Sequence, residues 1–236
     1  MNSRLIAALV VFTTVASAEV IEKTKNIAGT TVHYKVVLPN NYDAGRAYPA
    51  ILGFGGGPQT MRTDDSVIDR NFREKAEKRG YIVVVPAAPE GQLFFEGGEK
   101  IFPEFLKQIL AEYKIRGNKF NSAGVSNGGI SAFYVASLNP QYFISITGFP
   151  GYLWESNPAR MQAISKMCSI NMFVGEDDPM GWQDLMKLQT EEMRAKGMNA
   201  HYTVEKGQPH RIETLAGAGA SRLFDGFEAA KKGCGR

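Results

Sequence analysis

The chain has 236 residues, of which 44% are hydrophobic, 22% charged and 11% aromatic. This profile excludes a disordered, collagen-like or coiled-coil protein, and the length suits one large α/β domain or two small ones. The net charge of +3 comes from a weak excess of Lys and Arg spread along the chain, so no nucleic-acid-binding surface is indicated.

The N-terminal segment has the pattern of a secretory signal peptide. A basic start ending at Arg4 precedes the mostly apolar run Leu5 to Val15, and Ala16-Ser17-Ala18 matches a signal-peptidase site. The run is shorter than the roughly 20 residues of a permanent membrane span. We therefore expect residues 1–18 to be removed and residues 19–236 to be secreted or periplasmic, without a stable membrane anchor. An uncleaved N-terminal anchor is the alternative.

Past residue 18, apolar runs of strand length alternate with helical stretches. In chain order the pattern predicts strands over 31–38 and 50–54, a helix over 67–79, a strand over 81–85, a helix over 102–113, a strand over 120–125, a helix over 128–138, a strand over 142–147, a helix over 158–166, a strand over 170–174, a helix over 182–196, a strand over 201–204 and a closing helix over 212–231.

This alternation indicates a mostly parallel central sheet with helices on both faces. The first predicted strand, TVHYKVVL, alternates polar and apolar residues as a half-exposed antiparallel strand does, whereas YIVVV at 81–85 is apolar throughout, as a strand covered on both faces is. Because no linker, repeat or low-complexity tract interrupts the pattern, residues 19–236 are expected to form a single α/β domain with an antiparallel N-terminal part.

A Gly-x-Ser-x-Gly motif, GVSNG, occupies residues 124–128 between a predicted strand and a predicted helix. A serine becomes a nucleophile when a sharp turn exposes it beside a base and donors for an oxyanion, and flanking glycines keep side chains out of that turn. The strand-to-helix context favours Ser126 as a nucleophile over a structural Gly-Ser turn.

A base and an acid are found after later strands. Among the three histidines, His210 lies in a loop between the last strand and the last helix, whereas His33 and His201 lie in strands as partly exposed polar residues. For the acid, Asp178 of GEDDP (175–179) is preferred, with Asp177 and Glu176 as local alternatives. Loops at the carboxyl ends of parallel strands converge, so Ser126, Asp178 and His210 should meet.

These motifs resemble the α/β-hydrolase superfamily over nearly all of residues 30–233. The chain is similar in particular to compact secreted esterases related to polyhydroxybutyrate depolymerases and to feruloyl or acetylxylan esterases. That closer likeness is carried by GGGPQ (55–59), GVSNGG (124–129), GEDDP (175–179) and Pro209-His210. Many members place a His before the oxyanion glycines, where this chain has Phe54. The stretch 148–169 is too short for the helical cap of many lipases, so no sizeable cap is expected.

The resemblance implies a secreted serine hydrolase that cleaves carboxylic esters through an acyl-enzyme on Ser126. His210 would act as base and Asp178 as the acid that orients it. Backbone N–H groups of Asn127 and of the glycine loop, Gly56 in particular, would hold the oxyanion, although that loop is alternatively a flexible turn. No metal or cofactor is expected, and the substrates would be small-molecule or polymer-linked esters rather than nucleic acid. A serine peptidase or thioesterase on the same fold and a non-catalytic binding protein are the alternatives.

Four aromatic residues, Phe94, Phe95, Trp154 and Trp182, follow strands at the same sheet edge and are candidates for a substrate pocket, with ordinary packing as the equal alternative.

The two cysteines are too few for a disulfide-built fold. Cys168 precedes a strand at the edge opposite the site, and the closing helix should deliver Cys234 to that edge. A Cys168–Cys234 disulfide is therefore expected, with two unpaired thiols as the alternative.

Overall fold

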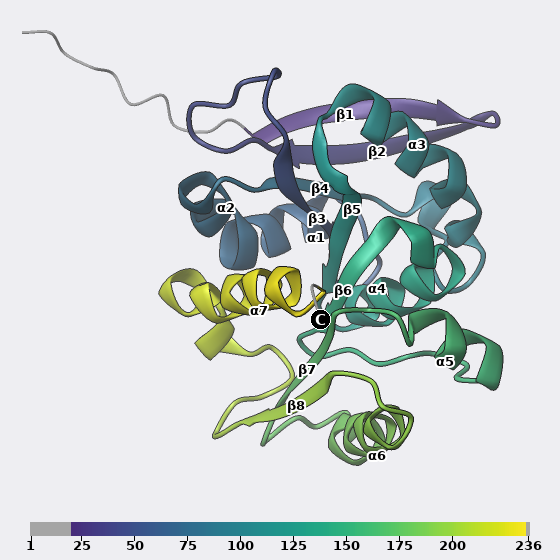
Figure 1. Cartoon of the computed structure of the whole chain (residues 1–236), viewed down its shortest axis with the longest axis vertical. Coiled ribbons are helices and arrows are strands. Elements are labelled where there is room, and N and C mark those ends of the chain that lie inside the picture. Colours follow the sequence, from purple (N-terminus) through teal and green to yellow (C-terminus); the bar gives the residue numbers. More distant parts are fainter. Residues whose placement is uncertain (1–19, 235–236) are drawn as a thin grey trace, which may run out of the picture.

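The computed structural model describes residues 20–234, built around an eight-stranded sheet in the order β1-β2-β4-β3-β5-β6-β7-β8 (Figure 1). Its strands are β1 (Val20–Ile27), β2 (Thr30–Val37), β3 (Tyr48–Phe54), β4 (Ile82–Pro86), β5 (Ile115–Gly124), β6 (Phe143–Gly148), β7 (Ser169–Gly175) and β8 (Ala200–Glu205). Strand β2 is antiparallel to β1 and β4, and all other neighbours are parallel. This is the α/β-hydrolase fold predicted above. The predicted signal peptide lies outside the described residues.

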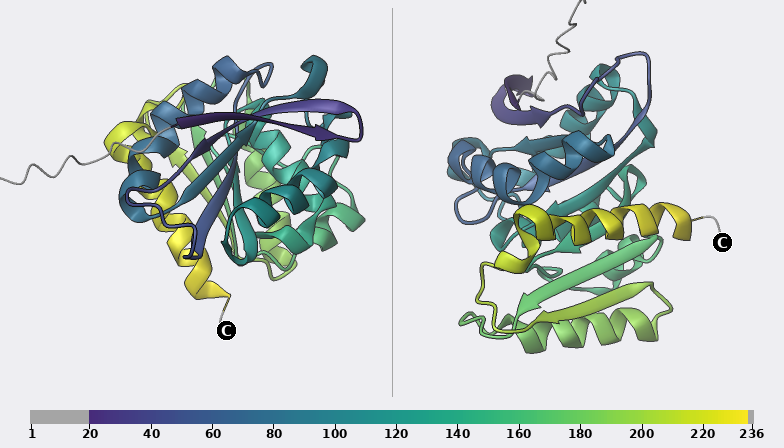
Figure 2. Two further views of the ribbon diagram at one scale, coloured as in Figure 1. Left: turned by 90° about the horizontal axis from the view of Figure 1, so that it is seen from above. Right: turned by 90° about the vertical axis from the view of Figure 1, so that its left-hand side faces the viewer.

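Helices cover both faces of the sheet (Figure 2). They are α1 (Met61–Val67), α2 (Arg73–Arg79), α3 (Phe102–Glu112), α4 (Asn127–Leu138), α5 (Pro158–Ile164), α6 (Trp182–Ala195) and α7 (Ser221–Gly233), with one π-helical turn, η1 (Ile68–Phe72), between α1 and α2. Two buried apolar clusters match the two faces: α1, η1, α2 and α7 contribute to one, and α3 to α6 contribute to the other. Only α5 lies between β6 and β7, so no helical cap is inserted there.

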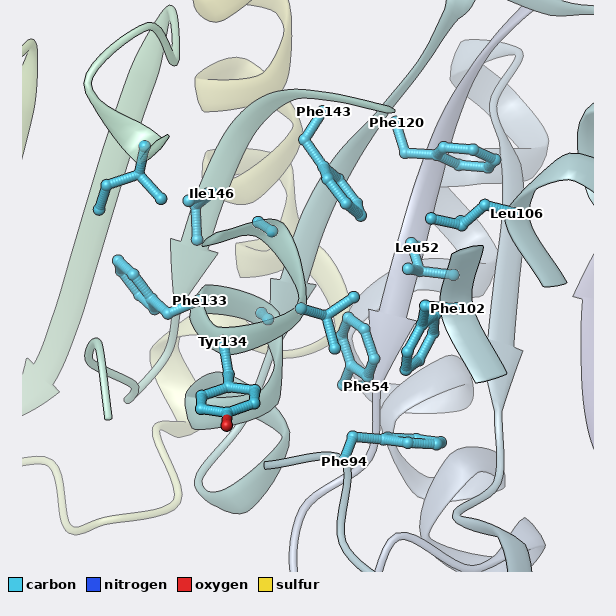
Figure 3. Packing of buried hydrophobic residues seen from close by; sticks show 14 of the residues in the cluster. Leu52, Phe54, Phe94, Phe102, Leu106, Phe120, Phe133, Tyr134, Phe143 and Ile146 are labelled. Carbon is cyan, nitrogen blue, oxygen red and sulfur yellow. The ribbon is translucent and has the colours of Figure 1, made fainter. Parts of the chain in front are cut away.

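The larger cluster is rich in aromatic rings (Figure 3). Phe54, the last residue of β3, packs edge-to-face against Phe94 and Phe102, with ring centroids 5.7 Å away in each case. Such edge-to-face pairs are a favoured arrangement of aromatic side chains. Phe54 therefore anchors the end of β3 by apolar packing at the point where the glycine-rich loop begins.

Strand β1 is missing from the predicted elements. Its sequence, VIEKTKNI, is too polar to stand out as an apolar run, and most of its residues are at least partly exposed. It is stabilised by antiparallel pairing with β2 along its whole length. Ala28 and Gly29 join the two strands with positive φ angles of 50° and 90°, as a two-residue hairpin turn requires.

Two helices differ from their predicted extents. The helix expected over 67–79 begins earlier, at Met61, and contains the π-helical turn. The closing helix expected from residue 212 begins only at Ser221, after the short 3₁₀ turns η5 (Glu213–Leu215) and η6 (Gly217–Ala220). The backbone is extended at Ala216 and left-handed at Gly217 (φ 54°), and both conformations interrupt an α-helix.

Cys168 and Cys234 form a disulfide, as the sequence predicts. Cys168 immediately precedes β7 and Cys234 immediately follows α7, and their Cα atoms are 5.1 Å apart. The bond ties the end of the last helix to the sheet edge opposite the carboxyl ends of the parallel strands.

Across residues 20–234, no helix is both long and apolar enough to cross a membrane.

Candidate active site

Ser126 lies on a sharp turn between β5 and α4. Its backbone angles, φ 59° and ψ −125°, are in a region that residues other than glycine rarely adopt and that costs on the order of 1–3 kcal/mol. Two hydrogen bonds fix this conformation: the Ser126 N–H donates to the Pro150 carbonyl at 2.8 Å, and the Ser126 carbonyl accepts from the Ile130 N–H at 3.0 Å. The surrounding chain thus holds the serine at the tip of the turn.

The glycines of the motif allow the turn to pack closely. A Cβ atom on Gly124 would lie 2.2 Å from the Gly128 carbonyl oxygen, and one on Gly128 would lie 2.3 Å from the carbonyl oxygen of Phe54. Both separations are far below van der Waals contact. Glycine is required at both positions because a side chain would push α4 away from β5 and from the end of β3.

Ser126, His210 and Asp178 form a continuous hydrogen-bonded chain. The Ser126 Oγ is 2.9 Å from His210 Nε2, and His210 Nδ1 is 2.8 Å from Asp178 Oδ2. The Asp178 side chain is fully buried, and its other oxygen accepts the Met180 N–H at 2.8 Å. The local alternatives Glu176 and Asp177 are solvent-exposed. Of the three acidic residues in this loop, only Asp178 contacts the histidine.

The loops that carry the acid and the histidine are bonded to each other. The Asp177 N–H donates to the Gln208 carbonyl at 2.9 Å, and a Cβ on Gly175 would lie 2.1 Å from the same oxygen. The Gln208 side chain in turn accepts the Glu213 N–H at 2.9 Å. The imidazole is therefore positioned by backbone contacts between two strand ends.

The glycine-rich loop after β3 lies directly beside the serine. A Cβ on Gly56 would be 3.0 Å from the Val125 carbonyl oxygen and 3.5 Å from Ser126 Cβ. Within residues 20–234, the backbone N–H groups of Gly56 and Asn127 have no hydrogen-bond acceptor. Free N–H groups beside a nucleophile are what an oxyanion formed on the serine requires.

Two side chains, Asn127 and Gln59, hold this loop. Asn127 Nδ2 donates to the Gly57 carbonyl at 3.0 Å. Gln59, which is fully buried, donates to Ser131 Oγ at 2.8 Å and accepts the Phe94 N–H at 3.0 Å. Gln59 is the last residue of the GGGPQ stretch, but no role for its side chain is predicted from the sequence.

The four aromatic candidates take different positions. The expectation that Phe94 faces substrate is wrong, because its ring is fully buried in the core against Phe54. Phe95 packs on Trp154, whose side chain is exposed, at a centroid distance of 5.9 Å. Trp182 contacts the site directly: its ring meets His210 edge-to-face at 5.0 Å. Trp182 thus contributes to fixing the plane of the imidazole.

A cavity of about 290 Å³ opens beside Ser126, and none of the four aromatic candidates lines it. Val67, Val125, Phe149 and Ile212 give it an apolar floor. Its polar rim includes Arg70, on the π-helical turn, which the sequence analysis did not single out. Nothing in the local sequence marks a helix for a π-turn, so this wall of the site could not be anticipated.

One buried carboxyl lies behind the glycine-rich loop. Asp64 of α1 is fully buried, and burial raises its pKa from 3.8 to about 8. Its Oδ1 atom would be 2.8 Å from a Cβ on Gly55.

Among residues 20–234, there is no group of three or more His, Cys, Asp or Glu side chains placed to bind a metal ion.

Comparisons with known proteins place the chain among esterases and related hydrolases. The Esterase family model matches residues 25–221. Dipeptidyl-peptidase 5 of Porphyromonas gingivalis is 30% identical over an alignment of 128 residues, which covers 49% of this chain and 19% of that relative.

Two solved structures share the fold. A ferulic acid esterase is 18% identical, with a TM-score of 0.71 over 92% of this chain and 99% of its own. The feruloyl esterase module from Clostridium thermocellum is 16% identical, with a TM-score of 0.69 over 90% and 88%. Since the family model spans most of the sequence, including the serine turn, the acid and the histidine, the chain belongs to the Esterase family.

Proposed function

We propose that this protein is a secreted serine esterase that cleaves carboxylic esters through an acyl-enzyme on Ser126. The observation that carries the proposal is the hydrogen-bonded chain Ser126–His210–Asp178, with the serine held at the tip of a strained turn. Membership of the Esterase family supports ester hydrolysis as the reaction class. The substrate is a small-molecule or polymer-linked ester.

The proposed mechanism follows from the positions of these atoms. His210 Nε2 accepts the Ser126 proton as Oγ attacks the ester carbonyl, and the buried Asp178 stabilises the resulting imidazolium. The N–H groups of Asn127 and Gly56 hold the negative oxygen of the tetrahedral intermediate. His210 then returns the proton to the departing alcohol. Water, activated by the same histidine, attacks the acyl-enzyme and releases the acid.

Export is part of the proposal. Its supports are the signal-like pattern of residues 1–18 and the Cys168–Cys234 disulfide, a bond typical of oxidising compartments. Expression of the full chain with its N-terminus intact, followed by N-terminal sequencing of the extracellular or periplasmic fraction, should give a mature start at Glu19. Recovery of only an uncleaved, membrane-bound product would contradict export.

A serine peptidase is the second candidate, because the chain is 30% identical over 128 residues to a dipeptidyl-peptidase. The two are separated by measuring kcat/KM for p-nitrophenyl acetate, butyrate and octanoate and for dipeptide p-nitroanilides. An esterase should turn over at least one ester and leave the anilides intact. Anilide turnover comparable to ester turnover would favour the peptidase.

The control for both assays is a matched pair of serine variants. Ser126→Ala should lower kcat by about 10⁴-fold or more, as removal of a triad serine does in hydrolases. Ser165→Ala, at the end of α5 and outside the site, should keep the wild-type rate. Equal activity of the two variants would refute the assignment of Ser126.

A further inference from the structure

The lining of the cavity beside Ser126 carries positively charged side chains. Among residues 20–234, its lining includes the guanidiniums of Arg70 and Arg211 and the imidazole of His210 but no Asp or Glu. An arginine is protonated at any working pH. The space next to the nucleophile thus combines an apolar floor with a cationic rim.

Arg70 is held at this rim by an unusual piece of backbone. It lies on the π-helical turn Ile68–Phe72, and such turns are rare and frequently found at functional sites. Phe72 is buried in the core below the turn. Asn71 donates from Nδ2 to the Leu215 carbonyl at 2.8 Å and fastens the turn to the segment that follows His210. The position of Arg70 relative to the triad is therefore fixed from two sides.

The guanidinium of Arg70 has unused hydrogen-bonding capacity. Among residues 20–234 it pairs with Glu213, with Arg70 Nη2 and Glu213 Oε2 2.9 Å apart. Glu213 is 59% exposed and also faces Arg211, at 3.6 Å from Nε, so one carboxylate serves two guanidiniums. A guanidinium carries five N–H donors, and a planar carboxylate can accept two of them side by side. Only 23% of the Arg70 side chain is exposed, which limits competition from water.

We propose that the cavity binds esters that carry a carboxylate, with Arg70 as the residue that selects them. The apolar floor contacts the methylene groups of the substrate. The Arg70 guanidinium binds the carboxylate of the substrate, either after releasing Glu213 or while still paired with it. The inference rests on the proposed esterase function and specifies its substrate class.

The test compares matched esters. Mono-p-nitrophenyl glutarate carries a carboxylate on the acyl side, and p-nitrophenyl butyrate is its neutral counterpart. The pair 4-acetoxybenzoate and phenyl acetate places the same charge on the leaving group. For each pair, the ratio of kcat/KM for the anionic ester to that for the neutral ester is measured in the wild type, Arg70→Gln, Glu213→Gln and the control Arg73→Gln. Arg73 lies one helical turn further on, outside the cavity, and pairs with Glu77.

Arg70→Gln should lower the ratio about 10-fold to 100-fold in one of the two pairs, which also identifies the side of the substrate that bears the charge. Glu213→Gln should raise the ratio in that same pair, because it removes the competing carboxylate. Arg73→Gln should leave the ratio at the wild-type value.

The inference would be overturned if Arg70→Gln left the ratio unchanged in both pairs, or if Glu213→Gln lowered it. The proposed function would still stand in that case, provided that the neutral esters are hydrolysed. No turnover of any ester by the wild type would instead refute the proposed function itself.

Discussion

Asp64 should make the stability of this protein fall as the pH rises, and Asp64→Asn should remove that dependence. Neither carboxyl oxygen of Asp64 has a hydrogen-bond partner within residues 20–234, and the residue is fully buried. Burial raises its pKa to about 8, and the positive charge of Lys35 offsets only part of that effect. Asparagine has nearly the same shape but cannot ionise.

The sign and size follow from proton linkage. In the unfolded chain Asp64 ionises near its ordinary pKa of 3.8, whereas the folded chain keeps the proton up to a pH of about 8. Between these values the folded state binds one more proton, so its stability falls with rising pH. The slope is about 1.4 kcal/mol per pH unit, or about 4 kcal/mol between pH 4 and pH 7. Above pH 8 the contribution is constant.

The assay is urea unfolding at closely spaced values from pH 4.5 to 8.5, with the disulfide oxidised. Plotted against pH, the difference in unfolding free energy between Asp64→Asn and the wild type should rise across this range. Asp65→Asn is the control, because Asp65 is the exposed neighbour that pairs with Lys35. A difference that stays flat with pH for Asp64→Asn would refute the reasoning.

Three further predictions concern the glycine packing, the disulfide and the loop beside Ser126. Gly128→Ala should lower kcat/KM at least about 100-fold, because its methyl would lie 2.3 Å from the Phe54 carbonyl oxygen. Gly226→Ala in α7 is the comparison: its methyl would meet only Asn171, at 3.6 Å, so this variant should raise stability by about 0.5–1 kcal/mol in thermal unfolding. Cys234→Ser should cost about 4 kcal/mol in urea unfolding, from the loop-closure entropy of a 66-residue separation, and an unchanged midpoint would contradict this. Gln59→Leu should lower kcat about tenfold with little change in KM, because Gln59 positions the oxyanion loop, and a change confined to KM would contradict that role.

The sequence was sufficient for the parallel strands and for the residues at their carboxyl ends. Buried strands are continuous apolar runs, such as IVVVP of β4, and they are visible without tertiary information. Loops after such strands converge on one edge, so the sequence predicts that Ser126, Asp178 and His210 meet, and their hydrogen bonds join them there. The Cys168–Cys234 disulfide was predicted by the same topological argument.

Features that depend on contacts between distant segments could not be predicted. Strand β1 is polar and owes its conformation to β2. Phe94 and Phe95 are adjacent in sequence, yet only the structure shows that Phe94 is fully buried beside Phe54 while Phe95 packs on the exposed Trp154. The role argued for Gln59 arises from a buried hydrogen-bond network, and that argued for Arg70 from a π-helical turn; the sequence does not reveal either contact.

The central claim, that Ser126 is the nucleophile activated by His210, is tested most directly by mapping a covalent adduct. The wild type, Ser126→Ala and His210→Gln are treated with a fluorophosphonate, digested and analysed by peptide mass spectrometry. The account predicts one phosphonyl group on Ser126 in the wild type, none in Ser126→Ala, and labelling slowed by several orders of magnitude in His210→Gln. An adduct on another serine, or labelling of Ser126→Ala at the wild-type rate, would contradict it.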